Sequence, residues 1–150
     1  MSELLVVDSE PEIANAIRRE LVGTAWCVTA EADPTIALGL IGGHAFDVVI
    51  AENWLEGMPG VEFLTRVRRH DPGIVRIILS AHADTTIMMQ SVNKAAIFRY
   101  IVKPWEPEEL KEVLFEAEIQ RHRQLQTQTA LRRIQLRELE EAYEKSRKDD

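Results

Sequence analysis

The sequence has one cysteine, no membrane-length apolar run and no basic residue near its N-terminus. The lone cysteine, Cys27, excludes an internal disulfide and fits a reducing compartment such as the cytosol. A membrane span needs about 20 apolar residues in succession, and no run approaches that length. The opening Met-Ser-Glu-Leu-Leu lacks the basic stretch that begins a signal peptide. These absences predict a cytoplasmic protein in which Cys27 packs as a small hydrophobic side chain.

Positive charge is also scarce over most of the chain. The formal net charge is −7, yet residues 121–150 hold eight Lys or Arg and six Asp or Glu, a local net of +2. Residues 1–120 therefore hold ten basic and nineteen acidic side chains, a net of −9. This balance disfavours general binding to nucleic acid or to an anionic membrane. The arginines near the start of the C-terminal part, Arg121 among them, are expected on a solvated helix face.

Short apolar runs alternate with stretches of helical periodicity over the first 118 residues. The runs predict five strands at residues 4–7, 26–30, 47–51, 74–79 and 98–102. Five helices are predicted after them: the first is capped by Ser9, the second by Asp33, the third spans 61–70, the fourth is capped by Asp84 and the fifth begins at Pro107. Such alternation is typical of an α/β protein with a doubly wound parallel sheet of strand order 2-1-3-4-5.

The pattern changes after residue 118, so we expect residues 1–118 to form one domain and residues 119–150 a helical extension. Residues 119–148 contain no Gly or Pro and are rich in good helix formers. A coiled-coil seam runs along this extension, with two polar interruptions. Its members are Leu125, Thr129, Arg132, Leu136, Leu139 and Tyr143. The extension is either a solvated helical tail or a helix that pairs in a dimer or leads to a further domain.

Polar side chains follow four of the five predicted strands. The first, third, fourth and fifth strands end at Asp8, Glu52, Ser80 and Lys103. In a doubly wound sheet these carboxyl ends converge on one crevice. Two acids, a hydroxyl and a lysine together suit a phosphoryl group and a divalent cation such as Mg²⁺.

The segments around these residues resemble the receiver domain of two-component response regulators. They are Leu4-Leu5-Val6-Val7-Asp8-Ser9-Glu10-Pro11, Asp47 through Gly60, Ile77-Ile78-Leu79-Ser80-Ala81 and Tyr100-Ile101-Val102-Lys103-Pro104-Trp105. The resemblance covers roughly residues 3–120. Phe63-Leu64, Val75-Arg76-Ile77-Ile78 and Lys103-Pro104-Trp105 are most similar to receivers of the hydrogenase-regulator and HD-GYP-linked kinds. The resemblance implies a flavodoxin-like fold that accepts a phosphoryl group from a histidine kinase onto an aspartate, with Mg²⁺.

The resemblance also assigns positions in this sequence. It places Glu52 at the phosphoacceptor, Asp8 and Ser9 at the acidic pair that binds the metal, and Trp54 at the position whose backbone carbonyl binds the metal. The switch residues fall on Ser80, Tyr100 and Lys103. Tyr100 is either the switch aromatic or a core residue, and the Trp54 side chain is free to act as a lid or a partner contact.

Two departures from the family pattern weaken phosphoryl transfer. The acceptor position holds Glu52, whose carboxylate lies one methylene, about 1.5 Å, further out than that of an aspartate. A misplacement of about 1 Å can cost about 10²-fold in rate. The second acid of the metal pair is replaced by Ser9, which removes an anionic ligand for Mg²⁺. Mg²⁺ therefore has only a weakened site at Asp8 and Glu52, and no cofactor is required.

Three interpretations of Glu52 follow. In the first, the domain is independent of phosphorylation, because Glu52 supplies a permanent charge near Ser80 and Lys103 or salt-bridges Lys103 and locks one state. In the second, a histidine kinase still phosphorylates the domain. In the third, the domain is a structural interaction or dimerisation module whose site is vestigial. The sequence Glu52-Asn53-Trp54 lacks the paired aspartates of a haloacid-dehalogenase-like phosphatase, so no enzyme is expected.

The expected partners are an output domain or a partner protein and a second copy of the chain. The predicted contact surfaces are the face formed by the fourth and fifth helices and the C-terminal helix. No nucleic acid or membrane partner is expected for this domain.

Overall fold

A computed structural model describes residues 1–81, 89–90 and 94–149 of the chain. Its main sheet has five parallel strands in the order β2-β1-β3-β6-β7. The strands are β1 (Ser2–Val7), β2 (Trp26–Glu31), β3 (Val48–Ala51), β6 (Val75–Ser80) and β7 (Arg99–Val102). Counted along the chain these are the five predicted strands, so the predicted order 2-1-3-4-5 is confirmed. The predicted capping residue Asp84 lies outside the described residues.

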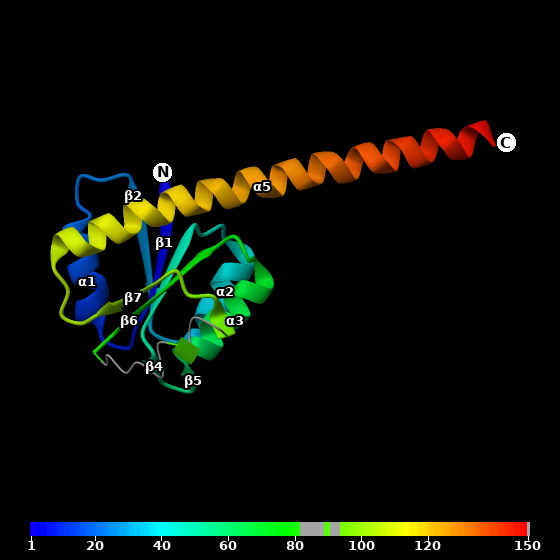
Figure 1. Cartoon of the computed structure of the whole chain (residues 1–150). Coiled ribbons are helices and arrows are strands. Elements are labelled where there is room, and N and C mark those ends of the chain that lie inside the picture. Colours follow the sequence, from blue (N-terminus) through cyan, green and yellow to red (C-terminus); the bar gives the residue numbers. More distant parts are fainter. Residues whose placement is uncertain (82–88, 91–93, 150) are drawn as a thin grey trace.

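Helices cover both faces of this sheet (Figure 1). They are α1 (Pro11–Glu20), α2 (Pro34–Gly43), α3 (Gly60–His70) and α5 (Pro107–Lys148). One core lies under α1 and α5 and is centred on alternate strand residues such as Val6 and Ile50. The other lies under α2 and α3 and contains the intervening residues, such as Val7 and Ala51. Strand residues packed on both faces explain the continuous apolar runs of the sequence.

Two local predictions about the N-terminal half are wrong and one is confirmed. Asp33 caps α2 by accepting a hydrogen bond from the Thr35 backbone N–H at 2.8 Å. Ser9 does not cap α1, because Glu10 is the N-cap residue and its N–H donates to the Asp8 carboxylate at 2.9 Å. Cys27 is exposed because β2 is an edge strand of the sheet.

A small hairpin follows β3 where the sequence indicated only a loop. Its strands β4 (Trp54–Leu55) and β5 (Met58–Pro59) pair antiparallel, and Gly57 makes the turn with a φ of +84°. At Gly60 the backbone folds back so closely that a β-carbon would collide with the carbonyl oxygen of Glu52 and lie 2.9 Å from the Asn53 α-carbon. The hydrogen bond from the Gly60 N–H to the Asn53 carbonyl, 2.8 Å, closes this loop beside Glu52.

Helix α5 continues without a break far beyond the sheet, as Figure 1 shows. Arg121 ties it to the domain: the guanidinium lies 3.4 Å from the carboxylate of Asp47 and 3.5 Å from that of Asp71. Its side chain is largely buried, so the solvated position expected for Arg121 is wrong. From residue 125 to 149 every side chain is exposed. No helix within the described ranges is both long and apolar enough to cross a membrane.

Candidate functional site

Four polar residues meet at the carboxyl end of the sheet. Asp8 follows β1, Glu52 follows β3, Ser80 ends β6 and Lys103 follows β7. Backbone hydrogen bonds extend the strand pairing to this edge, from the Glu52 N–H to the Val7 carbonyl at 2.9 Å and from the Lys103 N–H to the Ser80 carbonyl at 2.8 Å. Neighbouring parallel strands therefore deliver these residues to one place, as the sequence predicted. Asp8, Glu52 and Ser80 are all buried.

The Lys103 ammonium bridges the two carboxylates. Its Nζ atom lies 2.7 Å from Asp8 Oδ2 and 2.5 Å from Glu52 Oε2. The three side chains are only 3% to 11% exposed. Short charge-assisted hydrogen bonds in a buried setting are the strong class of polar contact. The longer glutamate arm thus brings its carboxylate directly to the lysine.

Further donors hold the Glu52 carboxylate in its ionised form. Burial by itself raises the pKa of the Glu52 carboxyl. Hydrogen bonds from Lys103 and Ser80, the charge of Lys103 and the Trp54 backbone N–H outweigh burial and lower that pKa below its ordinary value. The Trp54 N–H donates to Glu52 Oε1 at 3.3 Å. Burial likewise opposes the charge of Lys103, but the carboxylates of Asp8 and Glu52 raise the pKa of its ammonium. Glu52 therefore carries a standing negative charge at neutral pH.

These pKa shifts predict the pH dependence of stability. Because folding lowers the pKa of Glu52 from 4.5, its pairing stabilises the fold above pH 4.5 and is lost as pH falls through the folded pKa. Because folding raises the pKa of Lys103 from 10.5, the lysine contribution is lost only as pH rises through that raised value. As pH falls from 5 through the folded pKa of Glu52, we expect the free energy of unfolding to decrease less in Glu52→Gln than in the wild type. Urea unfolding across this range measures the difference.

The matched control for the acid titration is Glu62→Gln. Glu62 pairs with Arg66 at 2.9 Å on an exposed helix face, where ion pairs contribute little. Below pH 5, the free energy of unfolding of Glu62→Gln should fall with pH as it does in the wild type. If Glu52→Gln also lost stability with falling pH as much as the wild type, the lowered pKa of Glu52 would be contradicted.

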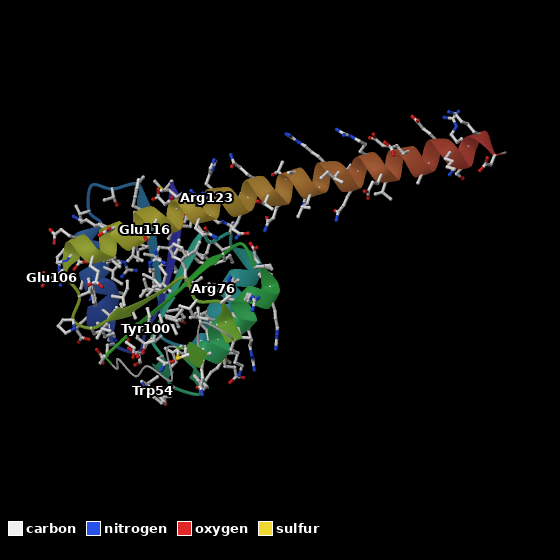
Figure 2. The ribbon with its side chains drawn as sticks, in the orientation of Figure 1. Trp54, Arg76, Tyr100, Glu106, Glu116 and Arg123 are labelled. Atoms are coloured by element: carbon white, nitrogen blue, oxygen red, sulfur yellow. The ribbon has the colours of Figure 1, made fainter. Side chains whose placement is uncertain are left out.

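The remaining predicted site residues differ in how far they are buried. Ser80 is fully buried beside Glu52. Tyr100 lies on β7, half-buried against the core under α2 and α3. Trp54 is 58% exposed at the lower edge of the domain in Figure 2, on the hairpin next to Glu52. Its exposure favours a partner contact over core packing. Ser9 is exposed.

The side chains at this edge do not form a good magnesium site, although Mg²⁺ is the cofactor that the resemblance implies. Mg²⁺ favours several oxygen ligands in octahedral geometry. Among the described residues, Asp8 and Glu52 are the two carboxylates that contact Lys103, and its ammonium already lies between them. No group of three His, Cys, Asp or Glu able to hold a metal occurs among the described residues. The cation held by this arrangement is the lysine itself.

A buried arginine near the amino end of β6 was missed by sequence reasoning. Arg76 lies on β6, four residues before Ser80, and is labelled in Figure 2. Its guanidinium donates to the carbonyl oxygens of Ile74 at 2.6 Å, Ala95 at 2.8 Å and Pro72 at 3.1 Å. Burial, with the nearby charge of Arg68, lowers the pKa of Arg76 to about 10. Arg76 holds the chain before β7 against β6 through these bonds. The signal for this role in the sequence was a basic residue inside the apolar run 74–79.

Comparison with known proteins gives a consistent result. A model of the response regulator receiver domain matches residues 4–115. The chain is 37% identical over 115 residues to the hydrogenase transcriptional regulatory protein HoxA of Cupriavidus necator, covering 76% of this chain and 23% of that protein. It is 31% identical over 107 residues to the DNA-binding response regulator MtrA of Mycolicibacterium smegmatis, covering 71% of this chain and 46% of that protein. The chain thus spans a quarter to a half of these relatives.

A solved structure agrees with the same assignment. The signal receiver domain of an HD domain-containing protein from Pseudomonas fluorescens Pf-5 superposes with a TM-score of 0.80 at 30% identity, covering 83% of this chain and 92% of that one. Receivers of the hydrogenase-regulator and HD-domain kinds, to which the sequence motifs are most similar, are therefore both among the relatives.

Proposed function

Because this chain belongs to the family of response regulator receiver domains, we propose that it is a receiver whose state does not depend on phosphorylation. The observation that carries this proposal is the Lys103 ammonium, which lies 2.5 Å from Glu52 and 2.7 Å from Asp8. In this proposal Glu52 stands at the phosphoacceptor position. The pairing of Lys103 with acid is built into the fold and needs no added phosphoryl group.

The charge of Glu52 imitates a phosphoryl group only in part. A carboxylate carries one negative charge and two oxygens, whereas a phosphoryl group carries about −2 and three acceptor oxygens. Glu52 engages both family switch partners, Lys103 and Ser80. This supports a fixed arrangement of the switch residues, with Tyr100 on the neighbouring strand as the third member. Whether this state activates or represses is a property of the output.

The proposed domain works without a metal and without catalysis. Phosphoryl transfer in the family needs a correctly placed acceptor and a cation with anionic ligands. Glu52 is too long for the first, and the neutral, exposed Ser9 weakens the second. Signalling then uses binding surfaces alone, so we propose that the chain is not an enzyme.

Incubation with radiolabelled acetyl phosphate and Mg²⁺ tests the proposal. We expect no stoichiometric label on the wild-type chain, because its acceptor and metal positions are both changed. A receiver with an intact aspartate, treated in parallel, is the control for the reagent. Acid-labile, stoichiometric label on Glu52 would overturn the proposal and make a histidine kinase the upstream partner.

A second candidate function is an interaction or dimerisation module with a vestigial site. The long exposed part of α5 favours it, because every described side chain from residue 125 to 149 is exposed. Glu52→Ala and Lys103→Ala separate the two candidates. A fixed-charge receiver should change its partner affinity or output in both variants, whereas a vestigial site should leave both unchanged.

The partners follow from these surfaces. We propose contact with an output domain or partner protein through α5 and the face beside it, and self-association through α5. The relatives HoxA and MtrA are a transcriptional regulator and a DNA-binding regulator. A nucleic-acid role for this chain would lie outside the receiver domain, which carries the acidic balance. A cytoplasmic location remains a proposal that rests on the lone cysteine and the family.

A further inference from the structure

The part of α5 beyond the domain has an apolar stripe that stays exposed in the described part of the chain. Leu125, Leu136, Leu139 and Tyr143 are 41% to 66% exposed and follow the heptad spacing of the predicted seam. Figure 1 shows this segment projecting away from the sheet. Isolated helices in water are marginal, and most helical stability in proteins comes from packing an apolar face. Packing this stripe against a partner would therefore stabilise the helix.

The charges of the same segment are divided into blocks. Residues 119–137 contain five arginines and no acid, and residues 138–144 contain four glutamates and no base. Arg121 of the first block pairs with the domain. Within the described part of the chain, no charged side chain of residues 132–144 has an ion-pair partner within 4 Å. Both blocks are thus available to a second helix.

We propose that α5 pairs with α5 of a second copy of this chain in antiparallel orientation, with the twofold axis between residues 137 and 138. In this register Leu136 packs against Leu139 of the second copy, and Arg132 lays its aliphatic stem on Tyr143. At the edge of the seam Arg133 faces Glu140 of the second copy, and symmetry makes each contact twice. Residues 131–137, the end of the basic block, then run along the acidic block, residues 138–144, of the other helix.

A parallel, in-register pair is the alternative that the charges oppose. It would place Arg132 against its own copy in the core of the seam and each block against a block of the same sign. Like charges at facing coiled-coil positions select against a pairing. In the parallel pair Arg133 and Glu140 would each face a glutamine, Gln128 and Gln135 respectively. The two orientations therefore differ in their response to charge reversal.

The antiparallel pair also determines where the two receivers lie. The helix rises about 1.5 Å per residue, so the Arg121 anchors of the two copies would be about 50 Å apart along the paired helices. The receivers would stand at opposite ends with their Glu52 edges free. This pairing rests on the homodimer proposed above but not on the fixed charge of Glu52. Acetyl phosphate labelling tests that charge separately.

Sedimentation equilibrium of charge-reversal variants tests the pairing. We expect Arg133→Glu and Glu140→Arg each to raise the dimer dissociation constant by about tenfold or more, because each places two like-charge pairs at the seam edge. The double variant should return to within about threefold of the wild type, since its charges complement again. Arg137→Glu, on the outer face of the helix, is the control for net charge. Circular dichroism checks that every variant remains helical.

Spin labels determine the direction of the pair. With Cys27→Ser and a single label at Thr127→Cys, antiparallel helices should give an interspin distance of about 30 Å or more. A distance below about 20 Å would show a parallel pair. That result, a monomer at all concentrations, or a double variant as weak as the single ones would each overturn the proposal.

Discussion

Replacing Lys103 with methionine is expected to lower the free energy of unfolding by about 3–5 kcal/mol. Lys103 contributes the ammonium that lies between Asp8 and Glu52, and all three side chains are largely buried. Methionine fills similar volume but leaves two carboxylates within a few ångströms of each other without a cation. Desolvation and mutual repulsion then act on both. Urea unfolding at pH 7 measures the loss.

Two further variants separate charge from packing at this position. Lys103→Met combined with Glu52→Gln should be more stable than Lys103→Met alone, because one of the unpaired charges is gone. Lys111→Met removes a lysine from the exposed face of α5 and should change stability by no more than about 0.5 kcal/mol. If Lys103→Met and Lys111→Met lost the same small amount, the bridging role of Lys103 would be refuted.

Restoring the family residues is expected to allow phosphorylation, whereas we expect the wild type to remain unlabelled. In the double variant Glu52→Asp with Ser9→Asp, the acceptor carboxylate shortens by one methylene and the metal site gains an anion. An oxygen of that carboxylate can then attack the phosphorus of acetyl phosphate, with acetate as the leaving group and Mg²⁺ bound by the acids. Since a shift of about 1 Å is worth about 10²-fold, we expect labelling to rise by at least that factor. Phosphate-affinity electrophoresis and intact mass measure it.

Two variants serve as controls for this gain. Ser9→Asp alone should stay unlabelled, because the acceptor is still misplaced. Glu52→Gln with Ser9→Asp has no nucleophile and should stay unlabelled as well. Labelling of the double variant that did not exceed that of the wild type would show that another feature limits phosphoryl transfer. The nearest such feature is the salt bridge of Lys103 to Asp8.

The sequence by itself was enough for the fold and for the four residues at the sheet edge. Buried parallel strands contact core on both faces, so each is a short unbroken apolar run that can be recognised locally. The polar residue that ends such a run lies at the carboxyl edge of the sheet. Asp8, Glu52, Ser80 and Lys103 could therefore be brought together from the order of elements alone.

Only the tertiary structure decided which groups contact one another and which face water. Ser9 stands beside a helix start, but Glu10 is the N-cap residue of α1, and its N–H donates to the Asp8 carboxylate. Cys27 sits in an apolar strand, but that strand is at the edge. Arg121 and Arg76 carry a charge that pattern analysis assigns to solvent. In the fold, Arg121 pairs with the distant carboxylates of Asp47 and Asp71. Arg76 donates to backbone carbonyl oxygens, among them that of the distant Ala95.

The same limit applies to the centre of the site. From the sequence, Glu52 could be a free charge or one locked to Lys103, because the length of a side chain does not say where its end points. The strand register and the folded-back backbone at Gly60 place its carboxylate 2.5 Å from the Lys103 ammonium. That distance depends on contacts between residues about fifty positions apart, and no local pattern of the sequence encodes it.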